Sequence, residues 1–202
     1  MARLALSKSS LSVQNRQLKI FERYLPSLDL KRRQLIAERA KAARVIAATE
    51  AEIDALLKLV ETGLPMVSNE EVNIEDLVHI AKLELGEENI MGVRLPVVRE
   101  IEFKYAHYGL LAKPEWVDNL AARMAEMLEL RVRIQLDRRR LALLDEAVRT
   151  ITQRVNLFDK VLIPRTRENI RRIHIFLADG ERAAVVRAKI AKGKRAREAI
   201  AT

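Results

Sequence analysis

The stretch LALLDEAVRTITQRVNLFDKVL, residues 141–162, repeats apolar side chains at intervals of seven residues. The repeat forms two neighbouring lines, one of Leu141, Val148, Val155 and Leu162 and one of Leu144, Ile151 and Phe158. On a helix with 3.6 residues per turn, a strict seven-residue repeat stays on one face only if two helices wind around each other with a left-handed twist. The stretch therefore predicts one strand of a coiled coil.

The N-terminal part of the chain carries a second repeat, which can supply the partner helix. Its clearest positions are Leu11, Leu18, Phe21, Leu28 and Leu35. The sequence ETGLP, residues 61–65, then places a glycine and a proline where a helix would stop, so we expect the first helix to end near residue 62. The sequence AKPEWVDNL, residues 112–120, opens the second long helix, with Pro114 in its first turn. We call the two apolar lines together the seam.

The segment between the two repeats has a different period. Arg99, Ile101, Phe103 and Tyr105 alternate with charged residues, and Gly86 and Gly92 interrupt the pattern. Alternation of this kind is typical of strands, and the glycines favour turns. We expect a small mixed insert that holds a short helix and a β-hairpin, with Pro96 at a strand end or edge.

Two long helices joined by a compact insert bury their apolar lines most simply as an antiparallel pair. The predicted fold is therefore mainly α, a long antiparallel two-helix left-handed coiled coil with a small insert. The predicted parts are an N-terminal helix (1–62), the insert (63–114), a C-terminal helix (115–192) and a basic tail (193–202), for which disorder is an alternative to helix.

Charge is distributed unevenly along the 202 residues, whose formal net charge is +9. Residues 1–45 and 163–202 are strongly basic, whereas residues 46–115 are acidic. In an antiparallel hairpin both basic ends come to one tip and the acidic insert lies at the other. Three interpretations of the tip stay open: a solvated helix face, a nucleic-acid surface, or a positive tip held inside a ring of acidic protein.

The sequence contains no pattern that is typical of a catalytic site. There is no cysteine, no phosphate-binding glycine loop and no clustering of His79, His107 and His174. We therefore expect no catalytic residue, no metal and no cofactor. No window of 18 uncharged apolar residues occurs either, so we expect a cytoplasmic protein without direct membrane insertion.

Three stretches resemble a known family. They are LKRRQL (residues 30–35), NIMGVRLP (residues 89–96) and TQRVNLFDKVLIPRTRENIRRIHIFLADGERAAVVRAKI (residues 152–190). Together with the rest of the chain they are similar to the D subunits of V-type and A-type rotary ATPases. The resemblance implies a non-catalytic central-stalk shaft that transmits torque between an ATP-hydrolysing or ATP-synthesising hexamer and the membrane rotor. The alternative is a basic coiled-coil protein that binds nucleic acid.

The resemblance also implies partners and contact residues. The partners are the catalytic and non-catalytic hexamer subunits, the small F subunit of the stalk and a funnel-shaped subunit that links the shaft to the membrane rotor, with no nucleic acid among them. The shaft would be cytoplasmic and peripheral to the membrane. The residues expected to face the hexamer are Arg3, Lys8, Arg16, Arg165, Arg171, Arg172, Arg182, Arg187 and Lys189.

Two prolines fall inside the expected helices. Pro26 departs from a continuous helix and predicts a kink. Pro164 removes one backbone hydrogen bond, so we expect curvature that makes the shaft eccentric and lets it push on one interface at a time. The alternative is that Pro164 is a tolerated kink and that the arginines beyond it only make the protein soluble.

Overall fold

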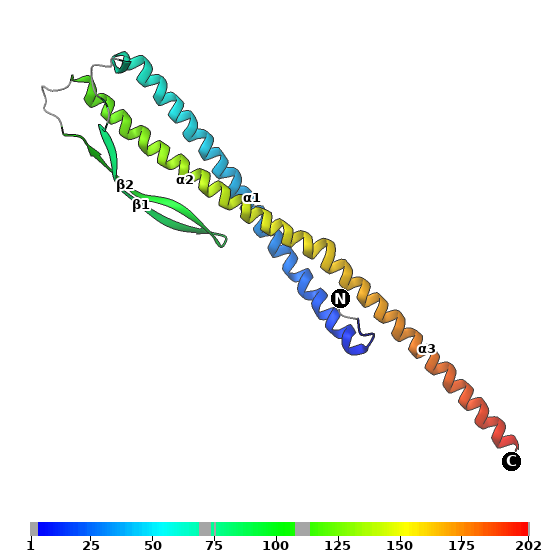
Figure 1. The fold of residues 1–202 in the computed structure, drawn as a ribbon. Coiled ribbons are helices and arrows are strands. Elements are labelled where there is room, and N and C mark those ends of the chain that lie inside the picture. Colours follow the sequence, from blue (N-terminus) through cyan, green and yellow to red (C-terminus); the bar gives the residue numbers. More distant parts are fainter. Residues whose placement is uncertain (1–3, 69–73, 75, 108–113, 202) are drawn as a thin grey trace. The chain divides into compact units, whose positions relative to one another are not determined.

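The computed structural model describes residues 4–68, 74, 76–107 and 114–201, and side chains up to residue 195 (Figure 1). The elements in chain order are α1 (Lys8–Gly63), the 3-10 turn η1 (Pro65–Ser68), β1 (Val78–Ile90), β2 (Val93–Tyr105), α2 (Trp116–Leu157), the π-helical turn η2 (Phe158–Leu162) and α3 (Ile163–Ala201). The predicted fold class, long helices in contact with a hairpin insert between them, is confirmed. The backbone of residues 193–201, set apart above as a basic tail, continues α3.

The chain divides into two compact units, which we describe separately. The first unit comprises residues 1–30 and 151–202, and the second comprises residues 31–150. Helix α1 contributes its beginning to the first unit and its remainder to the second. Its start is capped locally, because the Ser7 hydroxyl oxygen accepts a hydrogen bond of 3.2 Å from the backbone N–H of Ser10.

In the first unit, the N-terminal arm of α1 contacts η2 and α3. The rings of Phe21 and Phe158 meet edge to face, with 5.4 Å between their centroids. An aromatic pair of this geometry contributes about 0.5–1.5 kcal/mol beyond the area that it buries. Gln14 accepts a 3.3 Å hydrogen bond from the amide of Asn169. These contacts fix the antiparallel pairing of the two arms.

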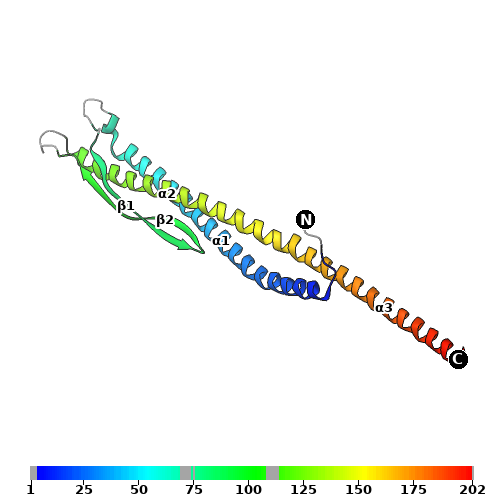
Figure 2. The same cartoon turned by 60° about the horizontal axis from the view of Figure 1, so that its bottom comes forward.

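In the second unit, the rest of α1 runs antiparallel to α2, and the two lie side by side in both views (Figures 1 and 2). Two ion pairs bridge them, one between Arg39 and Asp145 and one of 2.8 Å between Arg138 and Glu50. Exposed pairs of this kind contribute little to stability, so the apolar contacts must supply most of it.

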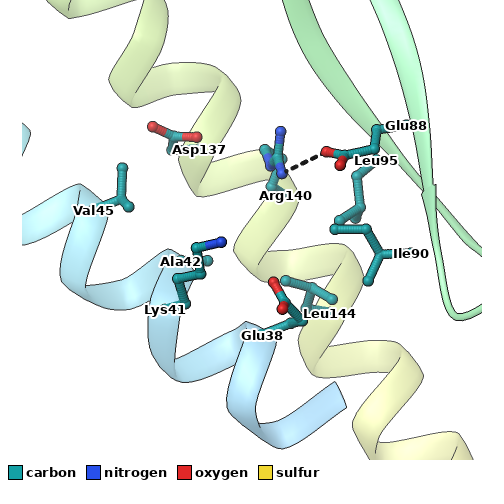
Figure 3. Close-up of a pocket in the computed structure, with 10 residues that line it drawn as sticks. All are labelled: Glu38, Lys41, Ala42, Val45, Glu88, Ile90, Leu95, Asp137, Arg140 and Leu144. Carbon is teal, nitrogen blue, oxygen red and sulfur yellow. Dashed lines mark hydrogen bonds and ion pairs between the residues drawn. The ribbon is translucent and has the colours of Figure 1, made fainter. Parts of the chain in front are cut away.

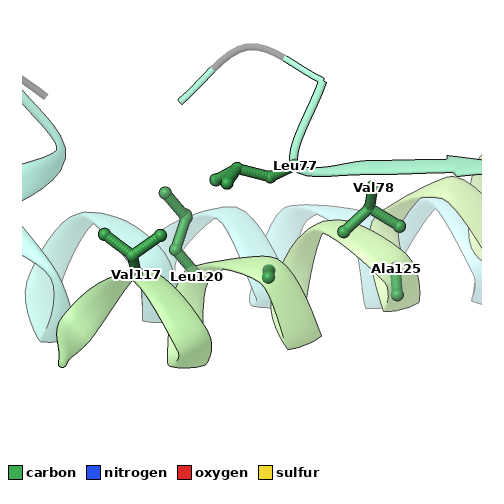
Figure 4. Close-up of a cluster of buried hydrophobic side chains, with 6 residues drawn as sticks. Leu77, Val78, Val117, Leu120 and Ala125 are labelled. Carbon is green, nitrogen blue, oxygen red and sulfur yellow. The ribbon is translucent and has the colours of Figure 1, made fainter. Parts of the chain in front are cut away.

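The most compact part of the core lies where the base of the hairpin meets α2. Figure 4 shows Leu77 and Val78 facing the helical residues Val117 and Leu120. Leu77 and Val117 are completely buried. Full burial of an aliphatic side chain stabilises a fold by about 1.5–3 kcal/mol, so this cluster anchors the hairpin on the helix.

The hairpin is a two-stranded antiparallel sheet in which Ile90 pairs with Val93. Its two-residue turn needs positive φ at both positions, and Met91 and Gly92 have φ of 54° and 82°. The Gly92 N–H donates a 2.8 Å hydrogen bond to the side chain of Asn89. Pro96 lies within β2 rather than at its end, opposite Glu87, which is compatible with a sheet that has only edge strands.

None of the seam residues named above is exposed. The side chains of Leu35, Leu144, Ile151 and Val155 are buried. Those of Leu11, Leu18, Phe21, Leu28, Leu141, Val148, Phe158 and Leu162 are half-buried.

The two prolines occupy different local structures. Pro26 lies inside α1, which runs without interruption from Lys8 to Gly63. Pro164 is the second residue of α3 and directly follows η2, where the Ile163 N–H bonds to the carbonyl oxygen of Phe158. The regular α-helical ladder is thus already interrupted where Pro164 enters.

Candidate functional site

The first unit carries a strongly basic surface. Its residues include 18 lysines and arginines against seven aspartates and glutamates. Eight of the residues that we expected to face a hexamer are described in the structure. All eight belong to this unit, and all eight are exposed. They are Lys8 and Arg16 on α1, and Arg165, Arg171, Arg172, Arg182, Arg187 and Lys189 on α3. Arg3 lies outside the described residues. We call the eight described residues the basic surface.

The ion pairs within the basic surface are local. Arg172 pairs with Glu168 at 3.1 Å, and Arg182 pairs with Asp179 at 3.6 Å, each on the same helix. Such exposed pairs are worth at most about 1 kcal/mol. They can therefore be exchanged for contacts with the carboxylates of another protein at low cost.

A concave patch adds to this surface on α1. Arg16, Lys19 and Arg23 line a hollow of about 380 Å³ together with Ile20. Three cations at spacings of three and four residues project from one side of the helix. This side is suited to an acidic partner.

The second half of α3 combines charge with exposed apolar side chains. Every residue from 179 to 195 is exposed, including Val185, Val186 and Ile190. Val185 is 62% exposed. Isolated helices gain little from propensity alone and usually depend on packing against another surface. Apolar groups that stay in water over several turns indicate a binding surface for another protein.

A second candidate lies in the second unit, where the hairpin reaches both helices. A cavity of about 260 Å³ is bounded by Lys41 and Val45 from α1, by Leu95 from β2 and by Arg140 from α2 (Figure 3). Arg140 donates to the carboxylate of Glu88 at 3.2 Å and to the carbonyl oxygen of Pro96 at 3.3 Å. The Arg140 side chain is only 22% exposed. It ties the hairpin to α2.

The run Arg138-Arg139-Arg140 looks in the sequence like a solvated helix face. The structure separates its members, because Arg138 bonds to Glu50 on α1 and Arg140 to the hairpin, while Arg139 is exposed. Only the fold brings Glu88 and Pro96 to Arg140. No local signal in the sequence distinguishes Arg140 from its neighbours.

The described residues offer little for chemistry. His79, His107 and His174 are exposed and lie on separate elements or loops. In the described part of the chain, no three His, Cys, Asp or Glu side chains are placed to hold a metal ion. A hydrogen bond from Lys82 to Glu84, together with the charge of Glu102, raises the pKa of Lys82. That lysine therefore stays a cation and links carboxylates of the hairpin.

Comparison with known proteins identifies the family. A family model described as the D subunit of ATP synthase matches residues 10–193. The chain belongs to the family of ATP synthase D subunits. The V-type ATP synthase D subunit of Borreliella burgdorferi is 34% identical over 192 residues, which are 95% of each chain. Its counterpart in Chlamydia felis is 35% identical over 198 residues, 96% of this chain and 94% of the relative.

The match to the D subunit covers most of α1, the hairpin, α2 and most of α3, so it includes the Arg140 contacts and every residue of the basic surface except Lys8. Among the helices that the structure describes, none has the length and apolar character needed to span a bilayer.

The contacts of Arg140 lead to a prediction about the hairpin of this D subunit. Replacing Arg140 by Ala removes two hydrogen bonds from a charged donor, each worth about 1.5–3 kcal/mol when shielded and less at partial exposure. We expect amide exchange in residues 86–97 to become about tenfold faster, as measured by hydrogen–deuterium exchange with mass spectrometry. The matched control is Arg139→Ala, which should leave that exchange unchanged. Equal exchange in the two variants would show that Arg140 does not hold the hairpin.

Proposed function

We propose that this D subunit is the central shaft of a V-type or A-type rotary ATPase. It would transmit torque between the hexamer that hydrolyses or makes ATP and the membrane rotor that moves ions. Family membership places the chain among the V-type ATP synthase D subunits. The observation that supports the shaft role most directly is the second half of α3, where basic and apolar side chains are exposed together over several turns.

The proposed partners follow from the same surface. The basic surface would lie inside a hexamer of alternating catalytic and non-catalytic subunits, with Val185, Val186 and Ile190 buried against its inner wall. A funnel-shaped subunit would join the other end to the membrane rotor, and the small F subunit would bind alongside. The protein would be cytoplasmic and peripheral to the membrane, as one component of the complex.

The proposed mechanism needs no catalytic group on the shaft. A shaft without threefold symmetry presents a different face to each of three catalytic interfaces, so the interfaces adopt different states. Closing one interface on nucleotide then favours a new shaft orientation. Chemistry and rotation are linked by the difference in binding free energy between orientations.

Curvature near Pro164 would strengthen this asymmetry. Proline and π-helical turns are both known causes of bends in helices, and here they are adjacent at residues 158–164. The kink expected at Pro26 would lie on the arm that pairs with this region. An eccentric shaft pushes on one interface at a time.

A charge-reversal experiment tests the hexamer contact. The double variant Arg171→Glu and Arg172→Glu replaces two exposed cations by anions, so we expect its affinity for a preassembled hexamer to fall at least tenfold at low salt. The loss should shrink as ionic strength rises, because screening weakens exposed charge interactions. Binding is measured by titration of the labelled full chain. Arg139→Glu in the second unit is the control and should bind like the parent; equal affinities for all three proteins would contradict the proposed contact.

The curvature hypothesis has its own test. Replacing Pro164 by Ala supplies a backbone N–H and removes the restriction that the proline ring places on φ. We expect the assembled complex to form normally but to move fewer ions per ATP hydrolysed, measured in reconstituted vesicles. Unchanged coupling would mean that the proline is merely tolerated.

The nucleic-acid alternative makes a different prediction. A phosphate-binding surface would give affinity for duplex or single strands that falls steeply with salt. Aromatic side chains for stacking on bases are scarce, since aromatic residues make up 4% of the chain. Co-purification with the nucleotide-binding subunits distinguishes the two functions.

A further inference from the structure

Along α1, positions shielded from solvent recur every seven residues. The two lines of such positions are 11, 18, 25, 32, 46, 53 and 60, and 14, 21, 28, 35, 42, 49 and 56. Position 39 is the exception, where exposed Arg39 pairs with Asp145. Both lines keep the seven-residue interval before and after position 39. Helix α1, the first arm, therefore contains no inserted residue over its whole length.

The second arm, which consists of α2, η2 and α3, follows the same repeat only as far as Leu162. Beyond it the shielded positions include Thr166, Ile170, Ile173 and Leu177, each one residue later than an unbroken repeat would place them. An unbroken repeat would instead bury positions 165, 169, 172 and 176. Asn169 is half-buried, but the side chains at the other three positions, Arg165, Arg172 and Phe176, are exposed. The second arm thus contains one extra residue between Phe158 and Ile170.

The π-helical turn η2 lies inside this interval. Its closing hydrogen bond runs from the Ile163 N–H to the oxygen of Phe158, five residues back instead of four. A turn closed in this way holds one residue more than an α-helical turn. In a regular helix, one extra residue would rotate everything after it by about 100°. The wider turn absorbs that rotation.

Proline alone does not produce such a displacement. Pro26 lies inside α1, yet Leu25 and Leu28 on either side of it remain in step with the repeat. The extra residue therefore accounts for the shifted positions, and Pro164 occupies a place where the hydrogen-bond ladder is already open.

We propose that η2 is a register element of the coiled coil. The turn accommodates one residue more than α1 has over the matching length. As a result Ile173, rather than Arg172, faces α1. The turn thereby sets the direction in which Arg165 and Arg172 point. At a seam position the Arg172 guanidinium would lose part of its hydration, which costs free energy. The inference concerns the packing of the chain itself, and only the destination of these arginines, the hexamer, rests on the proposed function.

Single-residue deletions test the register element. Deleting Asp159, an exposed residue of η2, should convert the π turn to an α turn and leave the seam in place. Arg149 is an exposed residue of regular helix. Deleting it must rotate Ile151, Val155 and Phe158 out of the seam, because no wider turn lies between residue 149 and these positions. We expect the unfolding temperature of the full chain to fall by less than about 3 °C for the Asp159 deletion and by about 10 °C or more for the Arg149 deletion. Asp159→Ala and Arg149→Ala control for the lost side chains.

A cross-link reports the register directly. The chain has no cysteine, and the side chains of Gln14 and Asn169 are in hydrogen-bond contact. Gln14→Cys combined with Asn169→Cys should cross-link with a short thiol reagent both in the full-length protein and after deletion of Asp159. If deletion of Asp159 instead shifts α3 by one residue along α1, Gln14→Cys will cross-link with Ile170→Cys in place of Asn169→Cys.

The same comparison is made with Pro164→Ala present, so that the cost of a proline inside a regular helix does not mask the effect. A loss of stability equal to that of the Arg149 deletion in both backgrounds, or a cross-link at residue 170, would overturn the inference. Neither readout requires a hexamer, so the outcome is independent of the proposed function.

Discussion

Each of the two units depends on the packing of two antiparallel helical segments along an apolar seam. Isolated helices gain little stability from propensity alone, so the buried residues of the seam, such as Leu35, Leu144 and Val155, supply the contacts that hold the helices together. The ion pairs between the arms are exposed and contribute little. The direction of the seam decides which side chains remain outside, and so it decides the surface on which function can act.

That surface differs between the two units. In the first unit the basic residues and the unpaired part of α3 face outward, which suits an acidic and partly apolar partner. In the second unit the hairpin is fastened twice, by the apolar cluster around Leu77 and by the Arg140 contacts near its turn. The proposed shaft would need an outer surface for its partners and an interior that does not deform when they push. The seam and the hairpin attachments provide the second requirement.

Much of the fold could be predicted from the sequence because its signals are periodic. The seven-residue repeat identified the two arms, and the alternation around Ile101 identified the hairpin. Gly92 indicated the turn of the hairpin. Met91 also takes positive φ, which the sequence does not predict for a methionine. The basic surface was predictable because charge accumulates at both ends of the chain.

Other features could not be predicted because they arise from tertiary contacts or from a shift of one residue. Arg140 differs from Arg138 and Arg139 only in what the folded hairpin places beside it. The turn η2 leaves a signal in the sequence, because Arg165 and Arg172 stand at seam positions, but this signal alone does not show where the seam continues. The burial of Thr166 and Ile173 in the folded chain shows that the seam continues one residue out of step.

A reversible cross-link shows whether this D subunit turns, as proposed, inside a hexamer during ATP hydrolysis. Arg182→Cys on the otherwise cysteine-free chain is joined by a disulfide to a single cysteine on the inner wall of the hexamer. If the chain is a rotating shaft, steady-state ATP hydrolysis stops in the linked complex and returns when the disulfide is reduced. Hydrolysis in the linked complex at the rate of the reduced one would contradict the account.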